Sequence, residues 1–577
     1  MGVSSAIFES AGQRSEHYVP GVYGRSFNVS SPSGISAGNL CILGKSNGGE
    51  PYKMLEFGSV ADAQQALVGG ELLDAVAHAF SGSNTFVPQR VFAMRVNDGT
   101  QSSVTLKTGA TDLMTLKSWD WGVHTNQLKI MIANGTIANS KKVTLAYKDN
   151  TEVTDDIVNA ALEVNYIGEN ITPMVSVSTS SISFYAMTDA DPSETADELV
   201  VSFDDFDTLD ALVAYINDSD TWQAAVVGNN ADLKSVKLDT VTNQSVAETG
   251  TTLYANYDAF VNAINAMEFI GNVVILDANT RQVPDNTDGY VYFTGGSIGS
   301  YGVQQWTDAL AALELEDVQI IATPSTDSGV HALISTHCSN MSNVINRKER
   351  TCILGGPIGM TDEDAIAEAQ GLNSRLVSFC CDNPLKVNLI SGKTETLSGA
   401  MLGVMLASME SAMSASTPLT FKALNVLGFT KIRNVANMTN LIKAGVMVCN
   451  ANPENLSEYI CIRALTTYQG NDLINNERSM VREDLFMNRD LRAQFKPVIG
   501  TAGISANAAI STLTERAKEW ALNGYIVPSD SNENVWDIKV RIDGDKVYIT
   551  YSRYLTAPVN FVFITAINHI YTSTVEL

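Results

Sequence analysis

The sequence predicts an α/β fold of the α+β multidomain kind, with a β-rich domain inserted into it. Between about residues 272 and 381, apolar runs of strand length alternate with helical patterns, which is typical of a largely parallel sheet flanked by helices. Residues 98–255 instead carry short β-like runs and turns rich in Thr and Ser, which favours a separate domain. The length of 577 residues suggests roughly three or four domains.

The N-terminal part divides into an extended arm, residues 1–30, and a first piece of the core, residues 31–97. Residues 26–38 are rich in Ser and Gly, so this stretch is either a flexible arm or a strand that pairs with something else. Ser59 with Asp62 three residues later is an N-terminal capping pattern. Helical spacing then continues to Phe80, and a strand is expected at residues 91–96, after Pro88.

The expected insertion, residues 98–255, contains predicted strands at 104–106, 128–132, 143–147 and 181–185. It also holds most of the excess negative charge. The chain has a net charge of −26, and residues 151–260 alone contain 20 Asp and Glu against two Lys. Such a stretch cannot lie along nucleic acid phosphates, so we expect no nucleic acid partner there. For any single acidic cluster, such as Asp204, Asp205 and Asp207, simple solubility is the favoured explanation.

The middle domain, residues 256–395, is expected to be α/β. Strands are predicted at 273–276, 318–323, 351–354 and 376–381, and helices at 304–315 and 330–345, with Thr361 capping a third. The C-terminal domain, residues 396–557, starts with a Met-rich helix at 396–413. It continues with strands at 446–449 and 460–466, helices at 479–495 and 505–522, and a hairpin that turns at Asp543-Gly544.

The last segment, residues 558–577, forms a C-terminal arm. Its apolar run at residues 559–567 follows Pro558 and has no obvious partner strand within the tail. No apolar run in the chain approaches the roughly 18 to 20 residues that cross a bilayer, so no membrane insertion is expected. Residues 1–12 lack the basic and then apolar order of a secretory signal, and we therefore expect the chain to fold in a cytosol.

A glycine-rich loop from Gly295 to Gly302 is the main motif that suggests chemistry. It precedes a helix and could in principle hold a phosphate on backbone N–H groups. It matches neither the dinucleotide fingerprint nor the P-loop. A plain loop is therefore favoured over a nucleotide site, and no cofactor is expected.

Catalytic and metal centres are also not expected. His331 and His337 are six residues apart, which does not fit the four-residue spacing of helical metal sites, and His337 falls on an apolar helix face. The chain has six His and no nucleophile elbow. Its seven Cys include no CxxC pair, so a disulfide framework or metal cage is not favoured. We predict that the protein is not an enzyme.

Four arginines are spaced so that they would share one side of a predicted helix, a pattern not expected by chance. In a continuous helix over residues 477–495, Arg478, Arg482, Arg489 and Arg492 project within about 80° of one another. Such a stripe suits an acidic partner surface, because guanidinium groups pair bidentately with carboxylates. A solvated face or intramolecular salt bridges remain open as alternatives.

Several motifs, in collinear order, resemble the contractile tail sheath proteins of phages and related injection machines. They are Val19-Pro20-Gly21-Val22-Tyr23, the strand at 88–96, Phe293-Thr294-Gly295-Gly296 with the following helix and strand, Leu465-Thr466-Thr467, Arg482 with Asp484, the helix at 510–524, and the closing strand at 558–567. The resemblance covers about three quarters of the chain but not the acidic block. One departure is that Ser297-Ile298-Gly299 stands where the family has an Asp-Gly pair.

The resemblance implies a conserved sheath core built from N-terminal, middle and C-terminal segments, with the acidic insertion as an outward-facing peripheral domain. It also implies that terminal arms add strands to sheets in neighbouring subunits. The arm residues would be Tyr18, Val19, Pro20, Val22, Tyr23, Phe27, Val559, Phe561, Phe563 and Ile567. The tube-contact candidates would be the stripe Arg478, Arg482, Arg489 and Arg492, with Arg516 and Lys518 of the next helix.

The function implied is that of a structural subunit that polymerises around a tail tube and contracts, without ATP, to drive the tube through a host envelope. Expected partners are copies of itself in stacked hexameric rings, the tube protein, and baseplate and tail terminator proteins. The expected location is the virion, with assembly in the host cytoplasm. The alternatives are a nucleotide-dependent α/β enzyme that uses the loop from Gly295 to Gly302, and a surface-array protein, which the missing signal sequence disfavours.

Overall fold

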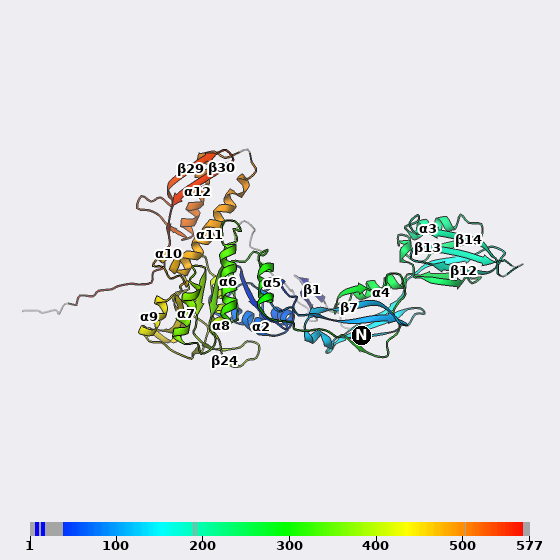
Figure 1. Cartoon of the computed structure of the whole chain (residues 1–577), viewed down its shortest axis with the longest axis horizontal. Helices are drawn as coiled ribbons and strands as arrows, with labels where there is room; N and C mark the ends of the chain where they lie inside the picture. Colours follow the sequence, from blue (N-terminus) through cyan, green and yellow to red (C-terminus); the bar gives the residue numbers. More distant parts are fainter. Residues whose placement is uncertain are drawn as a thin grey trace, which may run out of the picture.

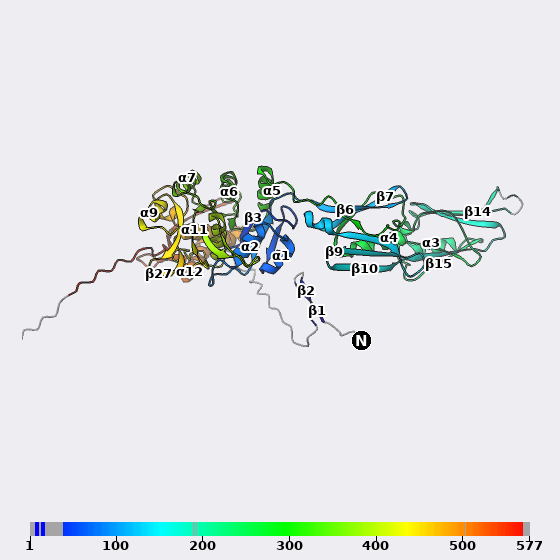
Figure 2. The ribbon, with the colours of Figure 1, turned by 90° about the horizontal axis from the view of Figure 1, so that it is seen from below.

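The computed structural model describes residues 6–10, 13–17, 38–188, 191, 193–501 and 503–568. Over these residues the molecule is elongated, with an α/β body at one end and two β-rich domains in line at the other (Figures 1 and 2). A C-terminal part packs on the body, and the final residues leave it as an extended segment (Figure 1). Strands β1 (Ala6–Ser10) and β2 (Gln13–His17) form an antiparallel hairpin.

The body is built on a sheet of eight strands that is parallel except at its two edges. Its inner strands are apolar and buried throughout, as parallel strands covered on both faces must be. In spatial order the strands are β27 (Asn455–Arg463), β26 (Val446–Asn452), β22 (Val377–Cys380), β21 (Thr351–Gly355), β20 (Ile320–Ala322), β3 (Leu40–Gly44), β5 (Val91–Arg95) and β4 (Met54–Phe57).

Helices cover both faces of this sheet, so alternate residues of β3 enter two different cores. Leu40 and Ile42 pack in one apolar cluster, and Cys41 and Leu43 pack in the other. The first face is covered by α1 (Val60–Leu67), α2 (Glu71–Phe80) and α8 (Gly399–Ser411). The second is covered by α5 (Val303–Leu313), α6 (Ser328–Met341), α7 (Asp362–Leu372) and α9 (Val435–Lys443).

A small sheet extends the body beyond the central one. It consists of β24 (Thr394–Thr396), β23 (Pro384–Val387) and β25 (Gly428–Phe429). Ser59 caps α1 by accepting a hydrogen bond from the Asp62 N–H at 3.2 Å, as its pattern predicts. The α/β class with an inserted β-rich domain is therefore confirmed.

The C-terminal part is held to the body by its long helix. Val481 and Leu485 of that helix join the body core, whereas Phe486 and Met487 join a separate cluster with Trp520. The elements are α10 (Leu473–Asn476), α11 (Arg478–Phe495), the 3-10 turn η3 (Lys496–Val498), α12 (Ala506–Leu522), β28 (Ile526–Val527), the hairpin β29 (Trp536–Asp543) and β30 (Lys546–Ser552), and β31 (Tyr554–Leu555).

The first β-rich domain, called the proximal domain, follows β5 and contains two sheets and one long helix around a single apolar cluster. One sheet has β6 (Gln101–Thr108), β7 (Thr111–Trp121) and β18 (Ile270–Ile275). The other has β10 (Asn150–Ile157), β9 (Lys141–Tyr147), β8 (Lys129–Asn134) and β19 (Val291–Tyr292). The helix is α4 (Asn256–Asn265), and η1 (Val123–Gln127) is a 3-10 turn.

The second β-rich domain, called the distal domain, spans residues 160–255 and is nested inside the proximal one. It contains 16 Asp and Glu and only two Lys. One sheet has β15 (Trp222–Val226), β11 (Ala160–Tyr166) and β17 (Thr251–Tyr254). The other has β14 (Thr195–Ser202), β13 (Ser181–Met187), β12 (Ile171–Val177) and β16 (Val241–Ser245), with α3 (Leu209–Ile216) and the turn η2 (Ser235–Lys237) beside them.

The strand pairing corrects the expected end of the insertion. β18 pairs with β7 and β19 pairs with β8, so residues 256–292 belong to the proximal domain and not to the α/β body. The strand predicted at 273–276 exists, but its partner lies outside the central sheet. The chain returns to the body only at α5, which begins at Val303.

Candidate assembly surfaces and buried polar sites

Of the expected N-terminal arm, residues 1–30, the structure describes the β1–β2 hairpin at residues 6–10 and 13–17, whereas the candidate arm residues fall outside the described residues. This applies to Tyr18, Val19, Pro20, Val22, Tyr23 and Phe27. Their role therefore stays a prediction.

The C-terminal arm residues lie in an extended segment that runs away from the body (Figures 1 and 2). Val559, Phe561, Phe563 and Ile567 are all exposed, with Phe561 at 68% and Phe563 at 93%. As far as residue 568, where the described chain ends, this segment pairs with no strand. Large apolar side chains on an unpaired extended backbone have the chemistry of a strand that completes another sheet.

The root of this segment is anchored on α11. The Arg553 Nη2 donates to Asp484 Oδ1 at 2.8 Å, and the Asn560 Nδ2 donates to Glu477 Oε1 at 3.0 Å. The guanidinium of Arg463 lies over the Phe561 ring, 5.8 Å from its centroid. The free part of the arm therefore starts beyond Phe561.

Glu483 of α11 lies beneath this root. Its side chain is fully buried, and neither of its carboxyl oxygens accepts a hydrogen bond of normal geometry. Burial raises its pKa to about 9, although Arg553 and the backbone N–H of Thr556 act in the opposite direction. Its side chain is therefore an uncharged carboxylic acid at neutral pH.

Two of the four arginines expected to form a surface stripe, those in the first turns of α11, are not on the surface. Arg478 and Arg482 are buried and share the carboxylate of Glu410 on α8. The Arg478 Nη2 to Glu410 Oε2 distance is 2.7 Å, and Arg478 Nη1 also donates to the Cys352 carbonyl at 2.9 Å. Although burial opposes ionisation, Arg478 and Arg482 lower the pKa of Glu410. These two arginines fix α11 on the central sheet, so intramolecular pairing is the alternative that holds for them.

The other tube-contact candidates differ in exposure. Arg489 is half-buried, and burial lowers its pKa. The Arg492 Nη2 binds Glu349 Oε2 at 2.5 Å and remains partly exposed. The Arg516 Nη2 donates to Asp490 Oδ1 at 2.7 Å, and the indole of Trp520 donates to the same carboxylate. Lys518 is exposed on α12. Of the six, Lys518 and Arg492 are the most accessible to a partner.

The glycine-rich loop connects the proximal domain to the body, and four of its N–H groups are already used. The Gly296 N–H donates to Asn126 Oδ1 at 2.8 Å, the Ser297 N–H to the Thr100 carbonyl at 3.2 Å, and the Gly302 N–H to Gln305 Oε1 at 3.0 Å. The Ser300 N–H donates to the Asp98 carboxylate. A phosphate cradle needs several free N–H groups, so these internal hydrogen bonds and the Asp98 carboxylate beside the loop disfavour a nucleotide site there.

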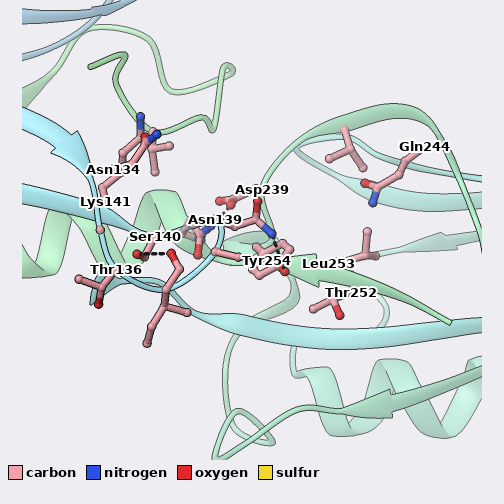
Figure 3. Close-up of a pocket in the computed structure, with 16 residues that line it drawn as sticks. Asn134, Thr136, Asn139, Ser140, Lys141, Asp239, Gln244, Thr252, Leu253 and Tyr254 are labelled. Carbon is pink, nitrogen blue, oxygen red and sulfur yellow. Dashed lines mark hydrogen bonds between the residues drawn. The ribbon is translucent and has the colours of Figure 1, made fainter. Parts of the chain in front are cut away.

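A cavity of about 850 Å³ lies between the proximal and distal domains (Figure 3). Asp239 from the distal side accepts hydrogen bonds from the N–H groups of Asn256 at 2.8 Å and Tyr257 at 2.9 Å, in the first turn of α4. Burial raises the pKa of Asp239 to about 6, against the effect of these two N–H groups. The Asn139 Nδ2 donates to the Tyr254 hydroxyl at 3.0 Å across the same junction. These contacts fix one domain on the other.

The cysteines and His337, considered in the sequence as possible metal ligands, are buried side chains in the structure. The seven cysteines are free and buried. His337 is buried and accepts a hydrogen bond from Arg350 Nη1 at 2.6 Å, and burial lowers its pKa to about 4. Over the described part of the chain, no group of three or more His, Cys, Asp or Glu is placed to hold a metal, and no helix has the length and apolarity of a membrane span.

Sequence reasoning missed Glu410, Glu483 and Asp239. Glu410 had a signal, because it is the only charged residue in the otherwise uncharged stretch of residues 397–421, and a buried carboxylate needs a cation. The sequence carries no such signal for Glu483 and Asp239, because segments far apart in the chain come together to form their surroundings.

No family model matches the chain. The chain is 25% identical over 586 residues to a tail sheath protein of Bacillus phage SP01, with 96% of this chain and 95% of the relative covered. It is 22% identical over 516 residues to a tail sheath protein of Staphylococcus phage Twort, with 83% and 86% covered. A sheath tail protein of Desulfitobacterium hafniense has the same fold, with a TM-score of 0.50, 13% identity, and 93% of this chain and 100% of that chain covered.

The exposed apolar segment that pairs with no strand as far as residue 568 has the chemistry of a subunit that assembles with others. The long alignments with phage relatives and the shared fold agree with this class. They support the contractile tail sheath family for this chain, as its motifs predict.

Proposed function

We propose that this chain is the structural subunit of a contractile tail sheath, which polymerises around a tail tube and contracts to drive the tube through the host cell envelope. Its neighbours would be further copies in stacked hexameric rings, the tube, and the baseplate and terminator proteins. The subunit would assemble in the host cytoplasm and act in the virion. The role is mechanical, with no chemical step.

The unpaired C-terminal arm is the observation that carries this proposal. Phe561 and Phe563 are exposed on an extended backbone, and a sheet edge on a neighbouring copy would bury them while pairing their N–H and C=O groups. Because a head-to-tail contact that does not close gives an open helical array, repeated arm exchange would produce a tubular wall.

The acidic distal domain would lie on the outside of that wall. It is at the end of the molecule opposite the C-terminal arm (Figure 1). Lys518 and Arg492 remain the accessible tube-contact positions. The extended sheath would be kinetically trapped, and contraction would bury more surface between copies while the arms keep them connected.

Truncation tests the proposal. Deleting residues 1–27, or ending the chain at residue 557, should leave folded chains that no longer form tubes, as seen by negative-stain electron microscopy. Phe561→Ser should weaken tube formation, because it removes a large apolar anchor from the arm. Val200→Ser, on the outer domain and also 68% exposed, is the matched control and should assemble normally. Normal tubes from both truncated chains would sink the proposal.

A further inference from the structure

The C-terminal arm does not leave the body freely but lies first along a polar seam on α11. Asp484 receives Arg553 at one end of the seam, and Glu477 receives Asn560 at the other. Thr556 lies between these anchors, and its N–H is 3.3 Å from the Tyr525 carbonyl. The seam therefore fixes residues 553–560 before the free strand begins.

Several buried polar atoms along the seam and at its Glu477 end have no hydrogen-bond partner. They include both carboxyl oxygens of Glu483, the Thr556 hydroxyl, Glu477 Oε2 and Asn560 Oδ1. A buried carboxylate without a hydrogen bond or ion pair is strongly unfavourable. A protonated carboxyl is uncharged and gains an O–H donor, so it can remain in such a place.

The charged and titratable groups around Glu483 do not neutralise it. Arg553 is engaged with Asp484 and with the Tyr551 hydroxyl at 2.9 Å. Arg482, next to Glu483 on α11, is engaged with Glu410. Asp484 would oppose a negative charge at Glu483, and burial is the largest cause of its raised pKa of about 9.

We propose that Glu483, fully buried on α11 between the anchors at Glu477 and Asp484, is the positioning residue of the C-terminal arm: it seats residues 553–560 on α11 and so sets the direction in which residues 561–568 leave the body. Ionisation would place an unpaired charge under the seam, beside Asp484, and would release the root. A strand held by a fixed root reaches a neighbouring sheet edge at a higher effective concentration than a loose one. The inference rests on the proposed function only in giving the arm a role in assembly. The contacts that hold residues 553–560 on α11 do not depend on that function.

The seat of the arm can be tested on the full chain before assembly. Hydrogen exchange of residues 553–560 is followed between pH 7 and pH 10, as the ratio of intrinsic to observed rates. In the wild type this protection should fall by about a hundredfold between pH 7 and pH 9 and level off near pH 10, because the seated carboxyl has a pKa of about 9 and the released one has an ordinary pKa. Glu483→Gln stays uncharged and should keep its protection through pH 10. Glu515→Gln, on the exposed side of α12, should behave as the wild type.

Equal loss of protection in the wild type and in Glu483→Gln would overturn the inference, as would a wild type without any pH dependence. Glu483→Lys adds a readout at neutral pH, since a permanent charge there should expose residues 553–560 to protease while α8 stays protected. The result is independent of the proposed function. If chains without the arm still form tubes, the proposed assembly role is wrong, whereas the inference that Glu483 seats residues 553–560 is unaffected.

Discussion

At the scale of single residues, the buried cluster of Glu410, Arg478 and Arg482 has one anion for two cations. Arg478 completes its contacts with the Cys352 carbonyl, Ser378 and Thr351. Arg482 instead has one guanidinium nitrogen, Nη1, without a partner. The attachment of α11 to α8 and the sheet therefore depends on the single carboxylate of Glu410.

We predict that Glu410→Gln destabilises the body by about 3 to 5 kcal/mol, because it leaves two buried guanidinium groups without a counter-charge. Urea denaturation measures this change. Glu515→Gln, the same substitution at an exposed site, should change the free energy of unfolding by less than about 0.5 kcal/mol. Equal stabilities of the two variants would contradict a structural role for the cluster.

At the scale of elements, α8 reaches the ends of the central strands so closely that only glycine fits. A Cβ on Gly355 of β21 would lie 2.2 Å from the carbonyl oxygen of Gly399, at the start of α8. Both atoms belong to backbone that is held in place, so neither can move aside easily.

Gly355→Ala should therefore lower the free energy of unfolding by about 1 to 3 kcal/mol. Gly371, inside α7, is the matched control because a Cβ there meets nothing within 4 Å. Gly371→Ala should raise stability by about 0.5 to 1 kcal/mol, since alanine is the better helix former. Thermal unfolding of both variants checks the opposite signs, and a stabilised Gly355→Ala would show that the contact can relax.

Most helices and strands could be predicted from sequence because their periodicity and caps are local. The partner of a strand is not local: residues 270–275 have the same pattern whether they pair with β7 or enter the central sheet, and so the domain boundary was misplaced. Arg478 and Arg482, expected on a surface stripe, are buried for a related reason. Leu485 lies within the same sector of the helix as the four arginines, and it indicated that this side faces a core.

At the scale of the whole molecule, the distal domain is a module joined to the proximal domain by adjacent strands. Its first and last strands pair directly, with Ala160 opposite Tyr254, so the two junctions are about 5 Å apart. Insertions with neighbouring ends disturb their host domain little.

Replacing residues 160–254 by a short Gly-Ser linker should leave the body folded and able to form tubes. The proximal domain should lose about 1 kcal/mol, because Asp239 no longer accepts from the first turn of α4. Circular dichroism and negative-stain microscopy measure folding and assembly, and the tubes should be narrower than those of the full chain. Collapse of the proximal domain would mean that the two β-rich domains fold as one unit.

The composition of the distal domain has a collective consequence in any polymer of this chain. Each copy contributes 16 acidic and two basic side chains at its outer end, so a filament would carry a dense anionic brush along its length. Two such rods repel each other over roughly one Debye length, about 8 Å at physiological salt. Filaments would thus repel one another over a longer distance at low ionic strength and would approach more closely when added salt screens the brush.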